Sequence, residues 1–231
     1  MIVAVIPARK GSKRIKNKNL IKFNNKPMIY WTIKAAINSK IFDYILVSTD
    51  SSEIAKISKK YGAKVPFLRS KKLSTDKASV HTVTVDSVKR LQRILNRKFD
   101  TVVQLMPNCP FRTSKDIIMA YNFFKKKKYN FLISCAKFFI TNPWWASKIQ
   151  KNGVVKRIFP INFNKRSQDM NLLYAPTGAI WIAKIKNFLK EKTFYGKNFR
   201  FYILNFKSAV DIDNIEDLNF AININKVKFY R

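Results

Sequence analysis

The 231-residue chain is poor in the residue types that several common kinds of site require. It contains two Cys, one His and five Gly, and its 13 Asp and Glu stand against 46 Lys and Arg. Cys109 and Cys135 are too few for a disulfide framework or a cysteine-rich metal cluster, and the single His81 excludes any mechanism that needs two histidines. No apolar run approaches the roughly 20 residues that cross a bilayer. These absences exclude disulfide scaffolds, zinc clusters and membrane spans.

The remaining composition is that of a folded globular protein. Hydrophobic residues make up 47% of the chain and aromatic residues 14%, which is enough apolar surface for a core and excludes intrinsic disorder. The N-terminus has no basic region before Ile2–Ile6 and reaches Pro7 too soon for a signal peptide. At this length a single domain over residues 1–231 is expected. We therefore expect one cytoplasmic domain with no membrane partner.

The formal charge of +33 has two explanations that the sequence alone leaves open. Lys and Arg bind the phosphates of nucleic acids, so a basic RNA- or DNA-binding α/β protein is one hypothesis. The chain is also rich in Lys, Ile, Asn and Phe, which together account for 102 of its residues and share A/T-rich codons. Nucleic-acid binding would not explain the Ile and Phe. The one basic run, Lys125–Lys128, follows an apolar helical stretch and is expected to be a solvated helix end.

The order of apolar segments predicts a doubly wound α/β sheet. Short apolar runs typical of buried parallel strands alternate with segments of helical period. Strands are expected at 2–6, 44–47, 64–67, 101–105, 131–136, 178–182 and 201–206. Helices are expected at about 27–38, 50–62, 79–96, 114–128 and 184–190, with a last one from about 214. Asp50 and Glu53 have the spacing of a capping box for the second helix.

Between residues 137 and 171 the alternation stops, and turns and short extended pieces replace it. The adjacent Trp144 and Trp145 need burial, either over the sheet edge or against another subunit, because aromatic residues are enriched at interfaces. The segment is therefore interpreted as an arm inserted into the domain.

The first strand is followed by a polar loop rich in cations. Arg9, Lys10, Lys13, Arg14 and Lys18 surround Gly11 and Ser12, which permit a close backbone approach to a ligand. Ligands of open α/β sheets lie at the carboxyl ends of the strands, and the first loop commonly meets phosphate. The loop has neither the Gly-Lys-Ser/Thr ending of a Walker A loop nor a Gly-x-Gly-x-x-Gly string.

Six strings in one order resemble the CMP-sialic acid synthetase family. They are Ile6–Ile15 with Lys18-Asn19, Val47–Ser51, Arg69 with Leu73–Ser79, Pro107–Thr113, Gly178–Ile180 and Asp211–Asp213. The resemblance covers nearly the whole chain. It implies a Rossmann-like sheet of the nucleotide-diphospho-sugar transferase type, a dimer formed through the inserted arm, and cytidylyltransferase activity for surface glycan biosynthesis. Such an enzyme transfers CMP from CTP to the anomeric hydroxyl of a nine-carbon sugar acid, an N-acylneuraminate, legionaminate or a relative, and releases pyrophosphate.

The resemblance also assigns residues to the nucleotide. Arg9, Ser12 and Lys18 would hold the triphosphate with Gly11, and Asn19 and Arg69 would hold the cytidine. Asp76 and Ser79 would lie near the nucleotide as well. Attack on the α-phosphate builds negative charge on its oxygens, so fixed cations and Mg²⁺ supply most of the stabilisation. Lys18, Arg9 and Asp211 are therefore the expected catalytic residues.

Asp211 and Asp213 are the expected metal ligands. They lie two residues apart, so on an extended segment their side chains share one face, and two carboxylates suit Mg²⁺. Asp213 also has the spacing to Glu216 of a helix N-cap, which is an alternative role for it.

The residues expected to meet the sugar depart from the family strings. The family has Gln where this chain has Met106, while Gln104 stands two residues earlier, and Thr177 replaces Asn before Gly178. Asn108 and Arg112 lie in the same loop as Met106, and Arg112 would meet the sugar carboxylate or end a helix in solvent. The expected substrate-binding residues are Gln104, Met106, Asn108, Arg112, Thr177 and Gly178. A cytidylyltransferase for another acidic sugar, such as Kdo or pseudaminate, remains an alternative.

Overall fold

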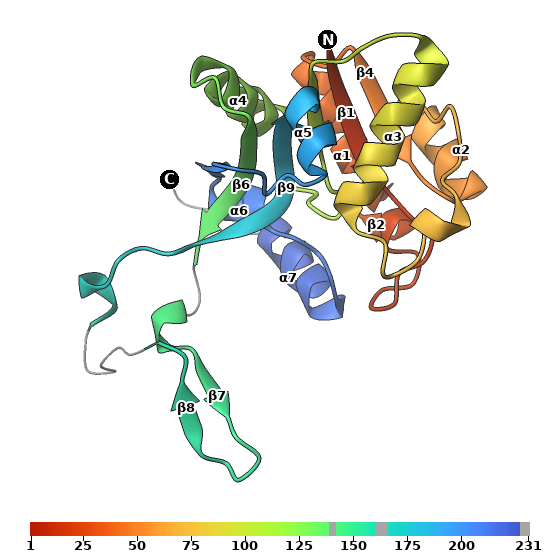
Figure 1. The fold of residues 1–231 in the computed structure, drawn as a ribbon. Helices are drawn as coiled ribbons and strands as arrows, with labels where there is room; N and C mark the ends of the chain where they lie inside the picture. The colour runs from red at the N-terminus through yellow and green to blue at the C-terminus, as the bar shows by residue number, and fades with distance from the viewer. Residues whose placement is uncertain (139–141, 160–165, 227–231) are drawn as a thin grey trace.

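The protein was analysed as a computed structural model that describes residues 1–138, 142–159 and 166–226. Its centre is a six-stranded sheet in the order β10-β6-β9-β5-β1-β4 (Figure 1). The strands are β1 Ile2–Pro7, β4 Tyr44–Ser48, β5 Thr101–Gln104, β6 Phe131–Lys137, β9 Tyr174–Lys184 and β10 Arg200–Ile203. Five strands run in one direction, and β9 runs antiparallel between β5 and β6. The predicted doubly wound, mostly parallel α/β sheet is confirmed.

Helices cover both faces of the sheet because successive residues of a strand point to opposite sides. Ala4 and Ile6 of β1 belong to one core cluster, and Val3 and Val5 belong to the other. The first cluster packs against α1 Met28–Ser39, α2 Ser52–Lys60 and α4 Ser114–Lys126. The second packs against α3 Val80–Leu95 and α5 Ile185–Glu191, which lie on the near side of the sheet in Figure 1.

The predicted strand at 64–67 is wrong. Lys64 makes a single parallel bridge to Leu46, with its N–H 2.8 Å from the carbonyl oxygen of Ile45. Pro66 follows two residues later and has no N–H to donate to a ladder, so the pairing ends there. The predicted strand at 201–206 is shorter than expected, because Asn205 caps the short helix α6 Phe206–Ala209 by accepting from the Ser208 N–H.

Two helix starts differ from the predicted capping boxes. α2 begins after Ser51, whose hydroxyl accepts from the N–H of Ile54, while Asp50 accepts from the N–H of Lys10 at 2.8 Å. The last helix, α7 Ile215–Lys226, is capped by Asn214 and Asp217 in a reciprocal pair. The Asp213 carboxylate is therefore free of the capping role that its spacing to Glu216 suggested.

A small hydrophobic layer beside the sheet joins the N-terminal segment to the last helix. Ile15 and Phe23 from the N-terminal segment pack against Ile212, Leu218 and Ala221, which lead into and form α7. The segment between contains the single turn η1 Lys18–Leu20 and the two-residue strands β2 Lys22–Phe23 and β3 Lys26–Pro27. This layer places the first loop against residues about 200 positions later in the chain.

The segment between β6 and β9 extends away from the sheet as an arm (Figure 1). It contains η3 Pro143–Trp145, the hairpin β7 Ser147–Ile149 with β8 Val155–Arg157, and η4 Ser167–Asp169. Residues 139–141 and 160–165 of the predicted arm lie outside the described residues. Both ends of the arm leave the sheet at one point, where Lys137 pairs with Tyr174. In the part of the chain that the structure describes, no helix is long and apolar enough to cross a membrane.

Candidate active site

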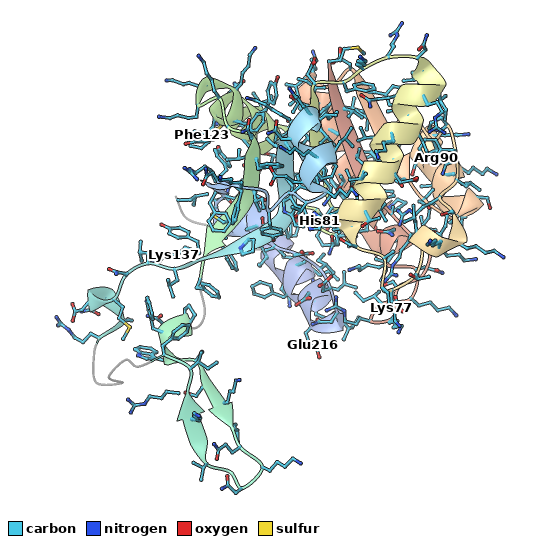
Figure 2. The ribbon with its side chains drawn as sticks, in the orientation of Figure 1. Lys77, His81, Arg90, Phe123, Lys137 and Glu216 are labelled. Carbon is cyan, nitrogen blue, oxygen red and sulfur yellow. The ribbon has the colours of Figure 1, made fainter. Side chains whose placement is uncertain are left out.

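A cavity of about 540 Å³ opens at the carboxyl ends of β1 and β5. Residues from the first loop, the segment before α3, the loop after β5 and the segment before α7 line it. They include Arg9, Gly11, Ser12, Lys13, Arg14, Lys18, Asn19, Arg69, Asp76, Met106, Asn108 and Asp213. Figure 2 labels two residues near this end of the sheet. They are Lys77, which is next to Asp76, and Glu216, which is in the first turn of α7. This is where an open α/β sheet binds its ligand.

On one side of the cavity Asp76 holds two cations of the first loop. Its carboxylate lies 2.7 Å from the Arg9 guanidinium and 2.8 Å from the Lys13 ammonium. The hydrogen bond from Lys13 and then that from Arg9 lower the pKa of Asp76. The loop before α3 is thereby tied to the loop after β1 in the absence of a ligand.

On the other side Asp213 holds two further cations. Its Oδ1 lies 2.7 Å from Lys18 Nζ, and its Oδ2 lies 2.7 Å from the Arg14 guanidinium. Lys18 Nζ also donates to the carbonyl oxygen of Ile212 at 3.0 Å. Partial burial acts to raise the pKa of Asp213, but the hydrogen bond and charge of Lys18 and the charge of Arg14 outweigh it, so the pKa is lowered.

Asn108 connects Asp213 to Asp211. Its side-chain Nδ2 donates to Asp211 Oδ1, to Asp213 Oδ1 at 3.1 Å and to the Ile212 carbonyl oxygen at 3.3 Å. The backbone N–H of Ile212 in turn donates to the carbonyl oxygen of Asn108 at 2.9 Å. The loop after β5 and the segment before α7 therefore present one amide and two carboxylates at one place.

Asp211 lacks a cation of its own among the described residues. Its outer surface is exposed, but Oδ1 lies against the Asn108 amide, and Oδ2 lies so near Gly178 that a Cβ on that glycine would be 3.1 Å away. Loss of water around the carboxylate, followed by the negative charge of Asp213, raises the pKa of Asp211 to about 6. All the groups here are oxygen or amide donors, which is the set that Mg²⁺ prefers.

The residues expected to hold the cytidine form the inner wall. Asn19 is buried and donates through Nδ2 to the Arg9 carbonyl oxygen at 2.8 Å, which leaves its buried Oδ1 without a partner. Arg69 is buried, with one terminal nitrogen donating to the Ser48 carbonyl oxygen and its Nε unpartnered. Burial lowers the pKa of Arg69 to about 10, so it stays charged at neutral pH. Both of these buried groups lack a hydrogen-bond partner in the described structure.

Besides Asp211 and Gly178, four of the predicted site residues do not line the cavity. Gln104 is fully buried and accepts from Thr84 Oγ1 at 2.6 Å, and Thr177 bonds Ser134 across the sheet at 2.7 Å. Ser79 is the N-cap of α3. Arg112 is 2% exposed and donates to the carbonyl oxygens of Met106 and Ala179. It therefore neither ends a helix in solvent nor lines the cavity. These side chains hydrogen-bond to polar groups of the fold, three of them at buried or part-buried positions and Ser79 at an exposed helix start.

Two charged residues of the cavity lining lie outside the predicted set. Lys13 and Arg14 belong to the same basic string as Arg9 and Lys18, and the string did not indicate which of its cations face the ligand. Gly178 does not line the cavity, yet it lets Met106 and Asp211 approach β9, since an added Cβ would lie 3.0 Å from Met106 Cγ. His81 stacks on Trp181 and accepts from the Phe194 N–H, so its role is structural.

A mostly parallel sheet with a cationic cavity and a carboxylate pair at its strand ends is the framework of a nucleotide-binding α/β transferase. The chain belongs to the cytidylyltransferase family, whose model matches residues 3–231. The predicted resemblance is confirmed.

Relatives across the whole chain agree with this family. A pseudaminic acid cytidylyltransferase of Campylobacter jejuni is 36% identical over 97% of this chain and 96% of its own. A CMP-N,N'-diacetyllegionaminic acid synthase of Legionella pneumophila is 36% identical over 92% of this chain and 90% of its own. An N-acylneuraminate cytidylyltransferase of Escherichia coli O18:K1:H7 is 33% identical over 98% of this chain and 52% of its own.

Two solved structures share the fold. A CMP:2-keto-3-deoxy-manno-octonic acid synthetase complexed with CTP superimposes with a TM-score of 0.70 at 16% identity, covering 97% of this chain and 98% of the other. A 4-diphosphocytidyl-2C-methyl-D-erythritol synthase from Anaerococcus prevotii gives 0.68 at 17% identity, covering 98% of each chain. At these identities the comparison establishes the fold alone.

Proposed function

We propose that this chain transfers CMP from CTP to the anomeric hydroxyl of a nine-carbon sugar acid and releases pyrophosphate. The observation that carries the proposal is the cavity itself. In it, Asp76 holds two cations of the first loop and Asp213 holds two others. The relatives, each matched over 92% or more of this chain, are named for three such acids, pseudaminic, N-acylneuraminic and legionaminic. Family and cavity favour this enzyme over the nucleic-acid-binding protein that the charge of +33 suggested. CTP as substrate places the reaction in the cytoplasm.

The cations of the first loop are the groups that bind the triphosphate. Arg9 and Lys13 share Asp76, and Lys18 and Arg14 share Asp213, so each carboxylate occupies cations that a phosphate would take over. A triphosphate carries several negative charges and offers these donors charge-assisted hydrogen bonds like those that the carboxylates accept. Lys18, with a side chain only 15% exposed, is the cation best shielded from water and is assigned to the charge that develops at the α-phosphate.

The residues around Asp211 fit a magnesium ion. The fit rests on the carboxylate pair, on the raised pKa of Asp211 near Asp213, and on the buried and unpartnered Oδ1 of Asn108. Asp211 and Asp213 would hold the ion, and its chemistry would be to neutralise phosphate charge and polarise the bond to the leaving pyrophosphate. Release of Lys18 from Asp213 would then turn this ammonium toward the substrate.

The sugar is expected beyond the α-phosphate, near Met106 and Asn108, which line the cavity on the side of the loop after β5. Met106 brings an apolar side chain where the family strings have Gln. Arg112 holds the Met106 carbonyl oxygen at 3.1 Å, and Gly178 receives the Met106 N–H at 3.2 Å. These contacts fix the loop and leave the Met106 side chain as the sugar-facing group of the described residues.

We also propose that the arm pairs two copies of the chain. It projects from the sheet with exposed apolar side chains, among them Trp145 and Ile149, the latter 79% exposed. A second cavity of about 750 Å³ lies at its base, lined by Phe138, Trp145 and Leu172 among others. Apolar surface of this kind commonly marks an interface. Light scattering of the purified protein is expected to give twice the 27.0 kDa of one chain, and a monomer at micromolar concentration would contradict the proposal.

The test of the reaction is pyrophosphate release from CTP in the presence of Mg²⁺. The acceptors to compare are N-acetylneuraminate, legionaminate, pseudaminate and Kdo, each also offered with UTP in place of CTP. We expect turnover with CTP and one of the nine-carbon acids. Absence of pyrophosphate with every acceptor would refute the proposal, and turnover with Kdo alone would replace the nine-carbon acid by an eight-carbon one.

A further inference from the structure

The Asn108 side chain occupies the point where the two carboxylates of the site converge. Its Nδ2 is within hydrogen-bond distance of Asp211 Oδ1 and of Asp213 Oδ1, so a single –NH₂ group bridges both acids. A cation shared by Asp211 and Asp213 would need to contact the same two oxygens. The amide therefore stands at the position that such a cation would take.

The other end of the amide is in an unusual state. Asn108 is 4% exposed, and its Oδ1 is buried without a hydrogen-bond partner in the described structure. A buried carbonyl oxygen left unpaired costs roughly 1–3 kcal/mol, and such exceptions in native proteins call for an explanation. The carboxylates accept hydrogen bonds but cannot donate them, so in this state the –NH₂ must face them and Oδ1 must face away.

The backbone of Asn108 keeps the amide in reach of the site. Its carbonyl oxygen accepts from the Ile212 N–H at 2.9 Å, which ties the loop after β5 to the residue between the two acids. A half-turn about the last side-chain bond would exchange Nδ2 for Oδ1 with no movement of the loop. The family string that this loop resembles has Thr at this position.

We propose that Asn108 is the third protein ligand of the divalent cation site, with Oδ1 as its ligand atom. In the cation-free protein the –NH₂ group holds Asp211 and Asp213 together in place of the ion. With the ion bound, the amide presents Oδ1, which gives the site three protein oxygens from two segments. The proposal rests on the magnesium site of the proposed function, but it concerns binding of the ion and not turnover.

The experiment measures Mn²⁺ binding to the full chain after chelator treatment, by electron paramagnetic resonance of free Mn²⁺ and by the melting temperature with and without the ion. Asn108→Asp supplies a charged oxygen but loses the –NH₂ bridge and adds a third like charge. We expect its melting temperature without metal to fall below that of the wild type, and its Mn²⁺ affinity to rise about tenfold. Asn108→Leu supplies no oxygen, and its affinity should fall at least tenfold.

Two further variants make the result decisive. Asn108→Thr keeps an oxygen donor and should stay within about threefold of the wild type in affinity. Asn219→Asp, an exposed change on α7 with the same change in charge, should alter neither quantity. A purely structural Asn108 would lower the affinity in both Asn108→Asp and Asn108→Leu, and that result would overturn the proposal. Unchanged affinity in Asn108→Leu would overturn it too.

Failure of this inference and failure of the proposed function give different results. A wild-type protein that binds Mn²⁺ with the expected variant pattern but releases no pyrophosphate would refute the reaction and keep Asn108 as a ligand. An active enzyme whose Asn108→Leu variant binds Mn²⁺ normally would keep the reaction and refute the ligand.

Discussion

Lys18 Nζ lies 2.7 Å from Asp213 Oδ1, although 195 residues separate the two in the chain. The pair closes the cavity between the first loop and the segment before α7. It also couples the cation assigned to the reacting phosphate with a carboxylate assigned to the metal. Substrate phosphate would replace Asp213 as the partner of Lys18, and the metal ion would replace Lys18 as the partner of Asp213. Binding of both would therefore break this ion pair.

Replacement of Lys18 by Met should abolish most of the activity and leave the fold intact. The variant loses a shielded cation at the position where phosphate charge develops, and we expect kcat to fall about a hundredfold or more. Lys16→Met removes an exposed lysine two residues away and is the matched control. Equal activity of the two variants, measured as pyrophosphate release, would contradict the assignment of Lys18.

Replacement of Asp76 by Asn should tighten the binding of CTP. Asp76 holds Arg9 and Lys13 in the ligand-free protein, so a triphosphate must displace it. Without the competing charge we expect the Kd for CTP to fall about threefold in a calorimetric titration. A weaker affinity would show instead that Asp76 positions the two cations for the nucleotide.

Replacement of Arg112 by Met should destabilise the protein instead of weakening sugar binding selectively. The guanidinium is buried and joins the Met106 and Ala179 carbonyl oxygens, and burial lowers the pKa of Arg112 to about 10. Loss of these bonds should cost about 3 kcal/mol in urea unfolding. A rise in KM for the sugar with an unchanged free energy of unfolding would restore the predicted contact with the sugar carboxylate.

Replacement of Gly178 by Ala should impair the metal site, although Gly178 itself does not line the cavity. The added methyl group would lie 3.1 Å from Asp211 Oδ2 and 3.0 Å from Met106 Cγ, so one of them must move. We expect a severalfold rise in the Mg²⁺ concentration that gives half-maximal activity. The same substitution at Gly11, where an added Cβ meets nothing within 4 Å, tests whether loss of glycine alone has this effect.

His81 should lower the stability of the fold as the pH drops below about 6.5. Burial lowers the pKa of His81 below its ordinary value of 6.5, so the unfolded chain takes up a proton there more readily than the folded one. The contribution is present above pH 6.5 and is lost as the imidazole, which accepts from the Phe194 N–H, becomes protonated.

The measurement compares melting temperatures at pH 7.5 and 5.5 for the wild type and His81→Gln. Asp211, with a pKa of about 6, titrates in the same window in both proteins, so the difference between them isolates His81. We expect the variant to lose roughly 2 °C less on acidification. An equal loss in both would exclude His81 as a source of the pH dependence.

The sequence predicted the fold well because its strands are fully buried and read as continuous apolar runs. Ile2–Ile6 has no polar face, and only a strand covered on both sides permits that. The direction of β9 could not be predicted, because apolar periodicity is the same for a parallel and an antiparallel strand. The sequence also left open whether Asp213 caps the last helix. In the structure Asn214 and Asp217 cap this helix instead.

The sequence indicated where the candidate site lies, but not which role each of its residues has. The basic string after Pro7 indicated where phosphate would bind, yet no local pattern distinguishes Lys13 and Arg14, which reach the cavity carboxylates, from Lys10 beside them. Gln104 and Arg112 looked like ligand-binding groups because the family resemblance associated them with the sugar acid. The structure gives them partners from distant elements, Thr84 on α3 and Ala179 on β9, which no spacing rule could supply.

The placement of the arm has a consequence for how enzymes of this shape can diverge. Cys135–Lys137 of β6 pairs with Tyr174–Pro176 of β9, so the chain leaves the sheet and re-enters it on adjacent strands. A two-residue turn could span the same gap, and the sheet register would not change. The arm can therefore lengthen, shorten or exchange its sequence as an independent module while the catalytic framework stays fixed.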